Sequence, residues 1–170
     1  MTLLMIVLRI VHVGLGVYWA GTLIFIALYL EPSVRAAGPE GGKVMQALIQ
    51  RGHLTVMPVV AFLNIAAGVT MYWVVDPSFR LWMYSGFHFA LAFGGLVSIV
   101  AFVLGVFVMR PAVLQAGAMA QAAAQLPEGP PRDSQMTEVQ RLRRRAAVFG
   151  RVVAGLLAVT VLAMAVARYV

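Results

Sequence analysis

Three histidines provide the only imidazole groups of this chain, and each lies in or at the end of an apolar run: His12, His53 and His88. An ionisable side chain inside a membrane span usually faces the bundle interior, a cavity or a partner. At a rise of about 1.5 Å per residue, His12 lies roughly 14 Å along the first run, and His88 lies roughly 12 Å beyond Arg80 at the start of the third. Two neutral imidazoles at one depth on facing helices can hold a b-type haem. We therefore predict that His12 and His88 are the two iron ligands.

A charged neighbour supports this interpretation of His12. Arg9 precedes His12 by one helical turn, where its guanidinium can pair with a haem propionate while the imidazole binds iron. The alternative is that Arg9, close to the end of its helix, reaches lipid headgroups without any cofactor.

Small residues accompany both histidines. Gly16 follows His12 by one turn, and Ala92 and Gly95 lie on the helical face of His88. Small side chains let a backbone approach a porphyrin, and they equally permit tight helix packing without a ligand. Gly16, Ala92 and Gly95 are therefore predicted cofactor-binding residues, with helix packing as the alternative.

A second polar face lies on the second apolar run. His53, Met57 and Asn64 recur there at helical spacing. Imidazole and thioether together suit copper(I), and an intramembrane asparagine needs a hydrogen-bond partner. These three residues form a predicted secondary polar site. Two other interpretations stay open: the methionines serve packing, and His53, near the opposite membrane face from His12, is an interfacial or quinone-contacting residue.

The elements that carry these residues follow from the composition. Of the 170 residues, 62% are hydrophobic and 11% are charged, which is typical of a membrane protein rather than a soluble domain. A helix needs about 20 apolar residues to cross a bilayer, and four runs reach that length. We expect an all-α polytopic membrane protein, a four-transmembrane-helix bundle. Residues 1–170 form a single membrane domain, with spans at about 3–30, 44–75, 81–109 and 147–167 and a cytoplasmic loop at 110–146.

The basic residues predict the orientation, because Lys and Arg beside a span tend to stay in the cytoplasm. The second loop holds only Arg80. Both termini should therefore lie on the periplasmic side of a bacterial inner membrane. The cluster Arg141–Arg145 should lie at anionic headgroups, and no nucleic-acid partner is expected. Loops one and three with their flanks carry ten of the thirteen basic residues: Arg35, Lys43, Arg51, Arg110, Arg132, Arg141, Arg143, Arg144, Arg145 and Arg151.

Prolines and polar turns predict where the helices end or bend. Pro32 should help to end the first helix, and Pro58 should bend the second. The Ala-rich stretch after Pro111 should continue the third helix into the cytoplasm. Thr137 and Gln140 have the spacing of a capping box that would begin the last helix.

Several kinds of chemistry are excluded. The chain has no cysteine, so it has no disulfide, thiolate metal site or cysteine nucleophile. It also lacks paired intramembrane carboxylates, a glycine-rich phosphate loop and a serine with histidine at nucleophile spacing. Hydrolysis and phosphoryl transfer are therefore not expected.

The first helix resembles a known group. His12, six further residues, and then "WAG" at Trp19–Gly21 followed by "LIFIALYLEPSV" are similar to the first helix of small bacterial membrane proteins of the CopD and HemJ type. The resemblance implies a compact helical bundle, with His12 as a haem or metal ligand and Trp19 beside it. The HemJ branch is a haem-b-associated protoporphyrinogen oxidase with a lysine in helix three, whereas the only lysine here is Lys43 in loop one. The CopD branch is linked to copper uptake.

These observations give one leading functional hypothesis and two alternatives. The leading one is a membrane protein that binds haem b and acts in electron transfer, or as an oxidoreductase linked to a quinone. The first alternative is a copper-handling or metal-handling transport protein of CopD type. The second is a non-catalytic accessory subunit of a larger membrane complex, and a homo-oligomer also stays open.

Overall fold

The protein is an all-helical membrane protein. The computed structural model describes residues 3–170, and all the regular secondary structure in that part of the chain is helical. Four helical stretches are long and apolar enough to cross a bilayer: Leu3–Ala36, His53–Val75, Gly86–Ala124 and Pro130–Tyr169. The elements are α1 (Leu3–Phe25), the π turn η1 (Ile26–Leu30), α2 (Glu31–Ala36), α3 (Gly38–Gln50), α4 (His53–Val75), η2 (Leu81–Met83), α5 (Gly86–Leu104), the π turn η3 (Gly105–Met109), α6 (Arg110–Ala124), α7 (Pro130–Val166) and η4 (Ala167–Tyr169).

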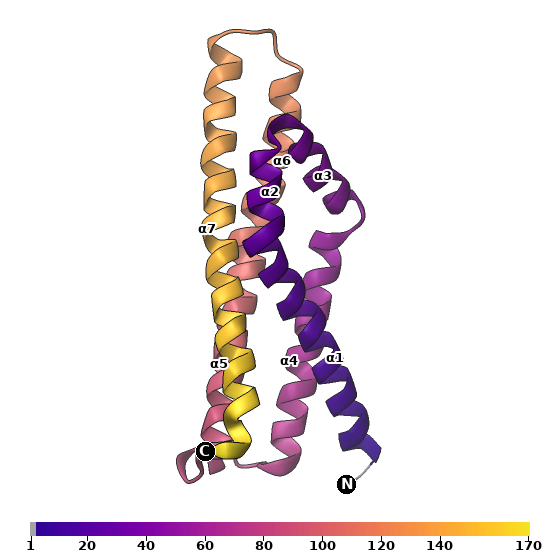
Figure 1. The fold of residues 1–170 in the computed structure, drawn as a ribbon, viewed down its shortest axis with the longest axis vertical. Helices are drawn as coiled ribbons and strands as arrows, with labels where there is room; N and C mark the ends of the chain where they lie inside the picture. Colours follow the sequence, from indigo (N-terminus) through magenta and orange to yellow (C-terminus); the bar gives the residue numbers. More distant parts are fainter. Residues whose placement is uncertain (1–2) are drawn as a thin grey trace.

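The four long helices form a bundle with two distinct ends (Figure 1). The start of α1 and the chain's C-terminus lie at one end, which we call the terminal end. At the other, the hairpin end, α6 and the first half of α7 project beyond the rest of the bundle. Helix α1 packs mainly on α4, α5 and α6 pack on α7, and α1 also contacts α7. The bundle therefore consists of two helix pairs that meet around a common core.

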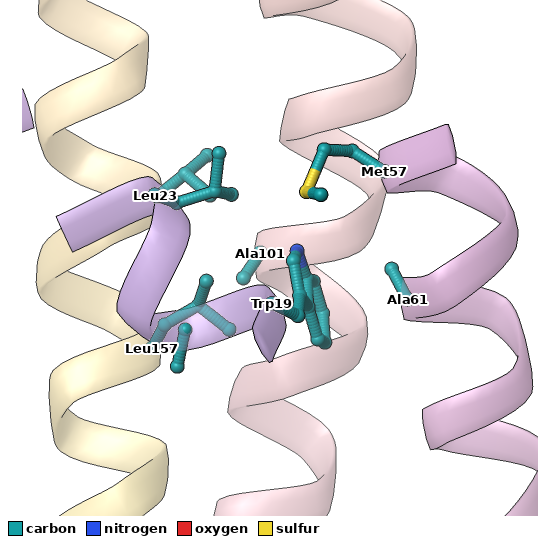
Figure 2. Close-up of a cluster of buried hydrophobic side chains, with 8 residues drawn as sticks. Trp19, Leu23, Met57, Ala61, Ala101 and Leu157 are labelled. Carbon is teal, nitrogen blue, oxygen red and sulfur yellow. The ribbon is translucent and has the colours of Figure 1, made fainter. Parts of the chain in front are cut away.

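Trp19 lies at the centre of that core. Its side chain is only 3% exposed, and Figure 2 shows its indole ring between Ala61 of α4 and Leu157 of α7. Many large apolar side chains outside this core are exposed, as expected where lipid is the surrounding solvent. The buried cluster contains Trp19, Ala20, Leu23, Met57, Ala61, Ala101, Val153 and Leu157.

Pro32 does not end the first helix, contrary to the expectation from the sequence. The chain continues through η1 into α2 as far as Ala36. The same arrangement recurs where η3 leads into Pro111 and α6, which confirms the predicted continuation of the third helix. In each case the π turn ends two residues before the proline. Proline has no N–H to continue the hydrogen bonds of an α-helix. The wider π turn, with its i→i+5 hydrogen bonds, places the missing hydrogen bond at the proline itself, so the helix can continue.

The second predicted span is divided. Residues 44–75 were expected to form one helix, but α3 ends at Gln50 and α4 begins at His53. Gly52 has a φ of +85°, a left-handed conformation that glycine adopts without a Cβ clash. Because of this break, His53 stands in the first turn of a new helix, at the end of α4 that is nearer the hairpin.

The last helix begins earlier than the sequence indicated. It starts at Pro130 after Gly129, rather than at a capping box formed by Thr137 and Gln140. The Thr137 hydroxyl instead donates to the Asp133 carbonyl within the helix, at 3.0 Å. Proline is favoured in the first turn because that position needs no N–H donor. Helix α7 is therefore a single element of 37 residues.

The third span also begins later than predicted, at Gly86 rather than at residue 81. Residues 76–85 form a loop that Asp76 holds together. Its Oδ2 accepts the Leu81 N–H at 2.7 Å, and its Oδ1 accepts the Ser78 hydroxyl at 2.8 Å. The pKa of Asp76 is lowered. Burial raises it, but hydrogen bonds from the Leu81 N–H, the Ser78 hydroxyl and the Arg80 and Ser78 backbone outweigh that effect.

Candidate functional site

A cavity of about 290 Å³ lies among α1, α4, α5 and α7. Three of its polar side chains are buried, because Asn64, Ser98 and Thr160 are 7%, 5% and 7% exposed. Buried polar groups that meet in an otherwise apolar cavity are typical of a ligand site. The lining residues are His12, Val13, Gly16, Val17, Trp19, Ala20, Asn64, Ser98, Leu157, Thr160, Val161, Met164 and Ala165.

His12 is anchored across the α1–α4 interface. Its Nδ1 lies 2.8 Å from the backbone oxygen of Asn64. A carbonyl oxygen can only accept, so Nδ1 must carry the proton in this hydrogen bond. In the neutral imidazole, Nε2 then keeps a free lone pair. Metal-binding histidines commonly have this arrangement, in which one ring nitrogen donates to a carbonyl and the other is available as a ligand.

Two glycines lie where α1 and α4 meet beside His12 and Asn64, and one of them is needed for the close approach. A Cβ on Gly68 would lie 2.8 Å from Cε1 of His12, so any other residue would displace the imidazole. A Cβ on Gly16 would lie 3.4 Å from Oδ1 of Asn64. Gly68 therefore provides the space for the His12 ring, whereas a Cβ at Gly16 would make only an ordinary contact with the Asn64 carboxamide.

Asn64 has unused hydrogen-bonding capacity. In the part of the chain that the structure describes, its Oδ1 is buried without a hydrogen-bond partner. Ser98 and Thr160 do not supply a proton to it, because their hydroxyls donate to the Gly95 and Leu156 carbonyls of their own helices. The lining of the cavity thus includes Asn64, whose Oδ1 is an unpaired acceptor, and His12, whose Nε2 keeps a lone pair. An unpaired buried polar atom is costly, so a ligand that pairs with Oδ1 would remove that cost.

The cavity opens sideways between α1 and α7. Val17 and Val161 line it and are also 70% and 49% exposed. By helical rise, Val17 lies about 21 Å from Leu3, and Val161 lies about 12 Å from Tyr169. Both depths fall within the roughly 30 Å hydrocarbon core of a bilayer. The opening therefore faces lipid rather than water.

Three of the predicted cofactor-binding residues meet at this cavity, namely His12, Gly16 and Trp19. Arg9 is exposed one turn from His12. Ala92 and Gly95 do not line the cavity, and no side chain lies within 4 Å of where a Gly95 Cβ would stand.

His88 does not line this cavity either. Its ring centroid lies 5.0 Å from that of Phe87 and 6.2 Å from that of Tyr72 on α4, both edge to face. Both of its ring nitrogens are buried without a partner among residues 3–170. The structure therefore does not bring His12 and His88 together around one cavity.

The predicted secondary polar site is divided between two places. Asn64 joins His12, whereas His53 and Met57 line a separate cavity of about 40 Å³ towards the hairpin end. Met109 and Arg110 line the same small cavity. The described residues contain no group of three or more His, Cys, Asp or Glu placed to hold a metal ion.

Among the polar and sulfur-containing side chains that line the cavity, sequence reasoning missed Ser98, Thr160 and Met164. A signal for two of them was present on α7, since Leu157, Thr160, Val161 and Met164 recur at i, i+3, i+4 and i+7, the spacing of one helical face. Nothing in that spacing indicated which neighbouring helix the face would meet.

Comparisons with known proteins give no assignment: no family model matches the chain, and no curated protein or solved structure is significantly similar to it.

Proposed function

We propose that this protein is a membrane redox protein that binds haem b through His12. The single observation that carries the proposal is the hydrogen bond from His12 Nδ1–H to the Asn64 carbonyl at 2.8 Å. It fixes the tautomer and leaves the Nε2 lone pair free beside a buried cavity, as an iron ligand requires. The resemblance of the first helix to the CopD and HemJ group supports the same residue.

The residues around His12 fit a haem in part. The cavity of about 290 Å³ is about twice the roughly 150 Å³ that accommodates benzene in a protein core, so a whole porphyrin also needs the opening between α1 and α7. Arg9 is exposed on the terminal side of His12, where it can neutralise a propionate. His88 has no part in this proposal, because it does not line the cavity.

The chain's own residues then have defined tasks. The Asn64 carbonyl orients the imidazole, His12 Nε2 would hold the iron of a bound haem, and the apolar walls exclude water. When bound, haem b supplies a one-electron couple whose potential depends on axial ligands, burial and nearby charge. A quinone in the bilayer is the proposed electron partner, because the opening between Val17 and Val161 faces lipid.

We also propose the bacterial inner membrane as the location, with the hairpin end in the cytoplasm and both termini in the periplasm. The basic residues of loops one and three support this orientation. A C-terminal reporter that is active only in the periplasm would test it.

An absorption spectrum of the purified protein, oxidised and dithionite-reduced, tests the haem proposal. Wild type, His12→Ala and the matched control His88→Ala should be prepared from cells with ample haem. We expect sharp reduced bands in wild type and His88→Ala and their loss in His12→Ala. A featureless wild-type spectrum would overturn the proposal, and equal loss in both variants would favour a two-histidine haem.

A copper-handling role is the second candidate, and one observation favours it. Met109 joins His53 and Met57 around the small cavity, which provides two thioethers and an imidazole, the ligands that suit copper(I). Arg110 lines the same cavity, and its positive charge opposes a cation there. Titration of wild type and Met109→Leu with copper(I) distinguishes the two candidates, because the haem proposal predicts no difference between these proteins.

A further inference from the structure

We propose that the cavity among α1, α4, α5 and α7 binds the ring of a lipid-soluble quinone, in its oxidised or its reduced form. The inference takes up the quinone partner of the proposed function, but it does not need a haem. It places the ring inside the bundle rather than at its surface, and it assigns recognition of a ring oxygen to the carboxamide of Asn64, which lines the cavity.

The walls of the cavity favour an uncharged ligand. The lining that the structure describes contains no Asp, Glu, Lys or Arg. Its one imidazole, His12, donates from Nδ1 to the Asn64 backbone oxygen at 2.8 Å. A charged ligand would therefore be buried without an opposite charge, which is costly. Ions and phospholipid headgroups fit these walls poorly, whereas an uncharged ring fits them well.

The volume and the opening of the cavity suit one ring that carries a tail. The cavity has about 290 Å³, whereas a cavity of roughly 150 Å³ accommodates one benzene. The additional volume gives room for the ring oxygens and small substituents of a quinone. Val17 and Val161 line the cavity and are also exposed where the bundle faces lipid. The apolar tail of the ligand can therefore pass between α1 and α7 into the hydrocarbon.

The Asn64 carboxamide is the polar group that matches a quinone. Asn64 is only 7% exposed, and its Oδ1 has no hydrogen-bond partner among residues 3–170. Oδ1 is also the atom closest to where a Cβ of the lining residue Gly16 would stand, at 3.4 Å. A carboxamide accepts from a quinol hydroxyl through its oxygen and donates to a quinone carbonyl through its nitrogen. Its terminal torsion is broad and roughly two-fold, so the same side chain can pair with either form.

Two buried hydroxyl groups favour the reduced form of the ligand. Ser98 and Thr160 line the cavity, and their hydroxyls donate to the Gly95 and Leu156 carbonyls. They have no further proton to donate, but each oxygen can still accept one. Acceptors pair with the hydroxyl of a quinol and not with the carbonyl of a quinone. We therefore expect the quinol to bind more tightly than the quinone.

Trp19 provides the readout, because it lines the cavity and quinones quench indole fluorescence. Trp73→Phe and Trp82→Phe remove the other two tryptophans of the chain, which are exposed and lie outside this lining. The purified full chain is titrated in detergent with a short-tailed benzoquinone, and the quinol is measured by the fluorescence that returns as it displaces the quinone. We expect saturable quenching and a lower Kd for the quinol. Quenching that rises linearly without saturation would show partition into the micelle alone and overturn the proposal.

Asn64→Leu tests the recognising residue, because it removes the carboxamide and keeps apolar volume. We expect its Kd for both forms to rise roughly threefold to tenfold, as for the loss of one hydrogen bond. Thr70→Val is the matched control, because Thr70 is an exposed polar residue on the same helix that does not line the cavity. An unchanged Kd in Asn64→Leu would overturn the assignment.

A second pair of variants keeps the test decisive if Asn64→Leu does not fold. Val161→Phe narrows the opening from the lipid side, and Leu162→Phe is its control on the same helix, because Leu162 is exposed and does not line the cavity. Weaker quinone binding in Val161→Phe alone supports the cavity as the site. Equal binding in the two variants overturns it.

The reduced absorption spectrum of the same preparation separates this inference from the haem proposal. Saturable quinone binding without haem bands supports the inference and overturns the haem proposal, whereas haem bands lost in His12→Ala with unsaturable quenching do the reverse. If both ligands bind, they should compete for the one cavity of about 290 Å³. Quinone sites that fall as haem content rises support both proposals, and full quinone binding to haem-filled protein overturns the cavity assignment. If neither ligand binds, both proposals fail.

Discussion

The Nε of Arg110 donates a hydrogen bond to the backbone oxygen of Leu54 at 3.0 Å. Leu54 lies four residues before Pro58, which is inside α4 and has no N–H to offer that oxygen. A side chain at the start of α6 therefore satisfies the carbonyl that the proline leaves free on a different helix. Proline is tolerated in a membrane helix when a neighbouring group pairs with the freed carbonyl in this way.

This relationship predicts a coupling between Arg110 and Pro58. Arg110→Met keeps the apolar stem but removes the donor, and we expect it to lower the free energy of unfolding by about 0.5–2 kcal/mol. In a Pro58→Ala background, residue 58 supplies its own N–H to Leu54, so Arg110→Met should cost much less. Unfolding in mixed micelles gives all four values of the double-mutant cycle. Equal costs of Arg110→Met in both backgrounds would show that Arg110 does not act through this carbonyl.

Gly68 should be intolerant of even one added methyl group. In Gly68→Ala the new Cβ would stand 2.8 Å from His12 Cε1, so the imidazole must move and lose the Asn64 carbonyl. We expect destabilisation of about 1–3 kcal/mol and loss of the haem that we propose His12 binds. Gly14→Ala is the control, because no atom lies within 4 Å of its added Cβ, and alanine is the better helix former by about 1 kcal/mol. Similar effects of the two substitutions would contradict this account of Gly68.

Asn64→Leu should separate stability from binding. It removes a buried carboxamide oxygen that has no hydrogen-bond partner within residues 3–170 and leaves the backbone oxygen that holds His12. Replacing an unsatisfied polar group by an apolar one of similar shape is neutral or stabilising, by up to about 1 kcal/mol. Thermal unfolding with and without ligand measures both effects. We expect an equal or higher melting temperature without ligand and weaker binding, whereas a large loss of stability would mean that the carboxamide is paired.

The loop after α4 should open in acid. The pKa of Asp76 is lowered from its usual 3.8, because hydrogen bonds to Leu81 N–H, Ser78 and the backbone outweigh the effect of burial. A carboxyl whose pKa is lower in the folded protein contributes stability above its unfolded pKa, and this contribution is lost as the pH falls through the folded value. Exchange of the Leu81 amide hydrogen, relative to its intrinsic rate, should therefore rise below about pH 4. In Asp76→Asn this acid-dependent rise should be absent, and a rise as steep as in wild type would assign it to another group.

The opening between α1 and α7 should control how the cavity is filled. Val161→Trp places a large side chain at the rim without touching the buried polar groups. We expect it to slow the uptake of haem from liposomes into the apoprotein. Leu162→Trp is the control on the same helix, because Leu162 is 64% exposed and does not line the cavity. Equal uptake rates in the two variants would point to a different route.

The sequence predicted which segments are helical better than it predicted where the helices begin and end. Four spans and the continuation past Pro111 follow from apolar length and helix propensity, which are local properties. Pro32 was expected to stop a helix, because the rule for proline takes no account of a π turn ahead of it. Gly52, with its left-handed φ, sets the start of α4, and Pro130, which is favoured in a first turn, sets the start of α7. Both signals are present in the sequence but are weaker than the hydropathy pattern.

The site was only partly predictable for a different reason. His12 was identified because a histidine in an apolar run is costly and therefore conspicuous. Its partner is the backbone oxygen of Asn64. Because every residue has a backbone carbonyl, the sequence does not indicate which one will accept this hydrogen bond. His88 satisfies the same sequence criterion as His12, yet it packs against Phe87 and Tyr72 instead. Which helix faces meet is a property of the assembled bundle. In this bundle His12 lines the cavity and His88 does not.

Helix α7 is one unbroken helix that runs from the projecting hairpin to the wall of the cavity. Its 37 residues correspond to about 55 Å at the usual helical rise, nearly twice the thickness of the hydrocarbon core. Its first half carries the exposed Arg143, Arg144 and Arg145, and its last turns carry Thr160 and Met164 on the cavity wall. The projecting hairpin and the cavity wall therefore belong to one unbroken helix.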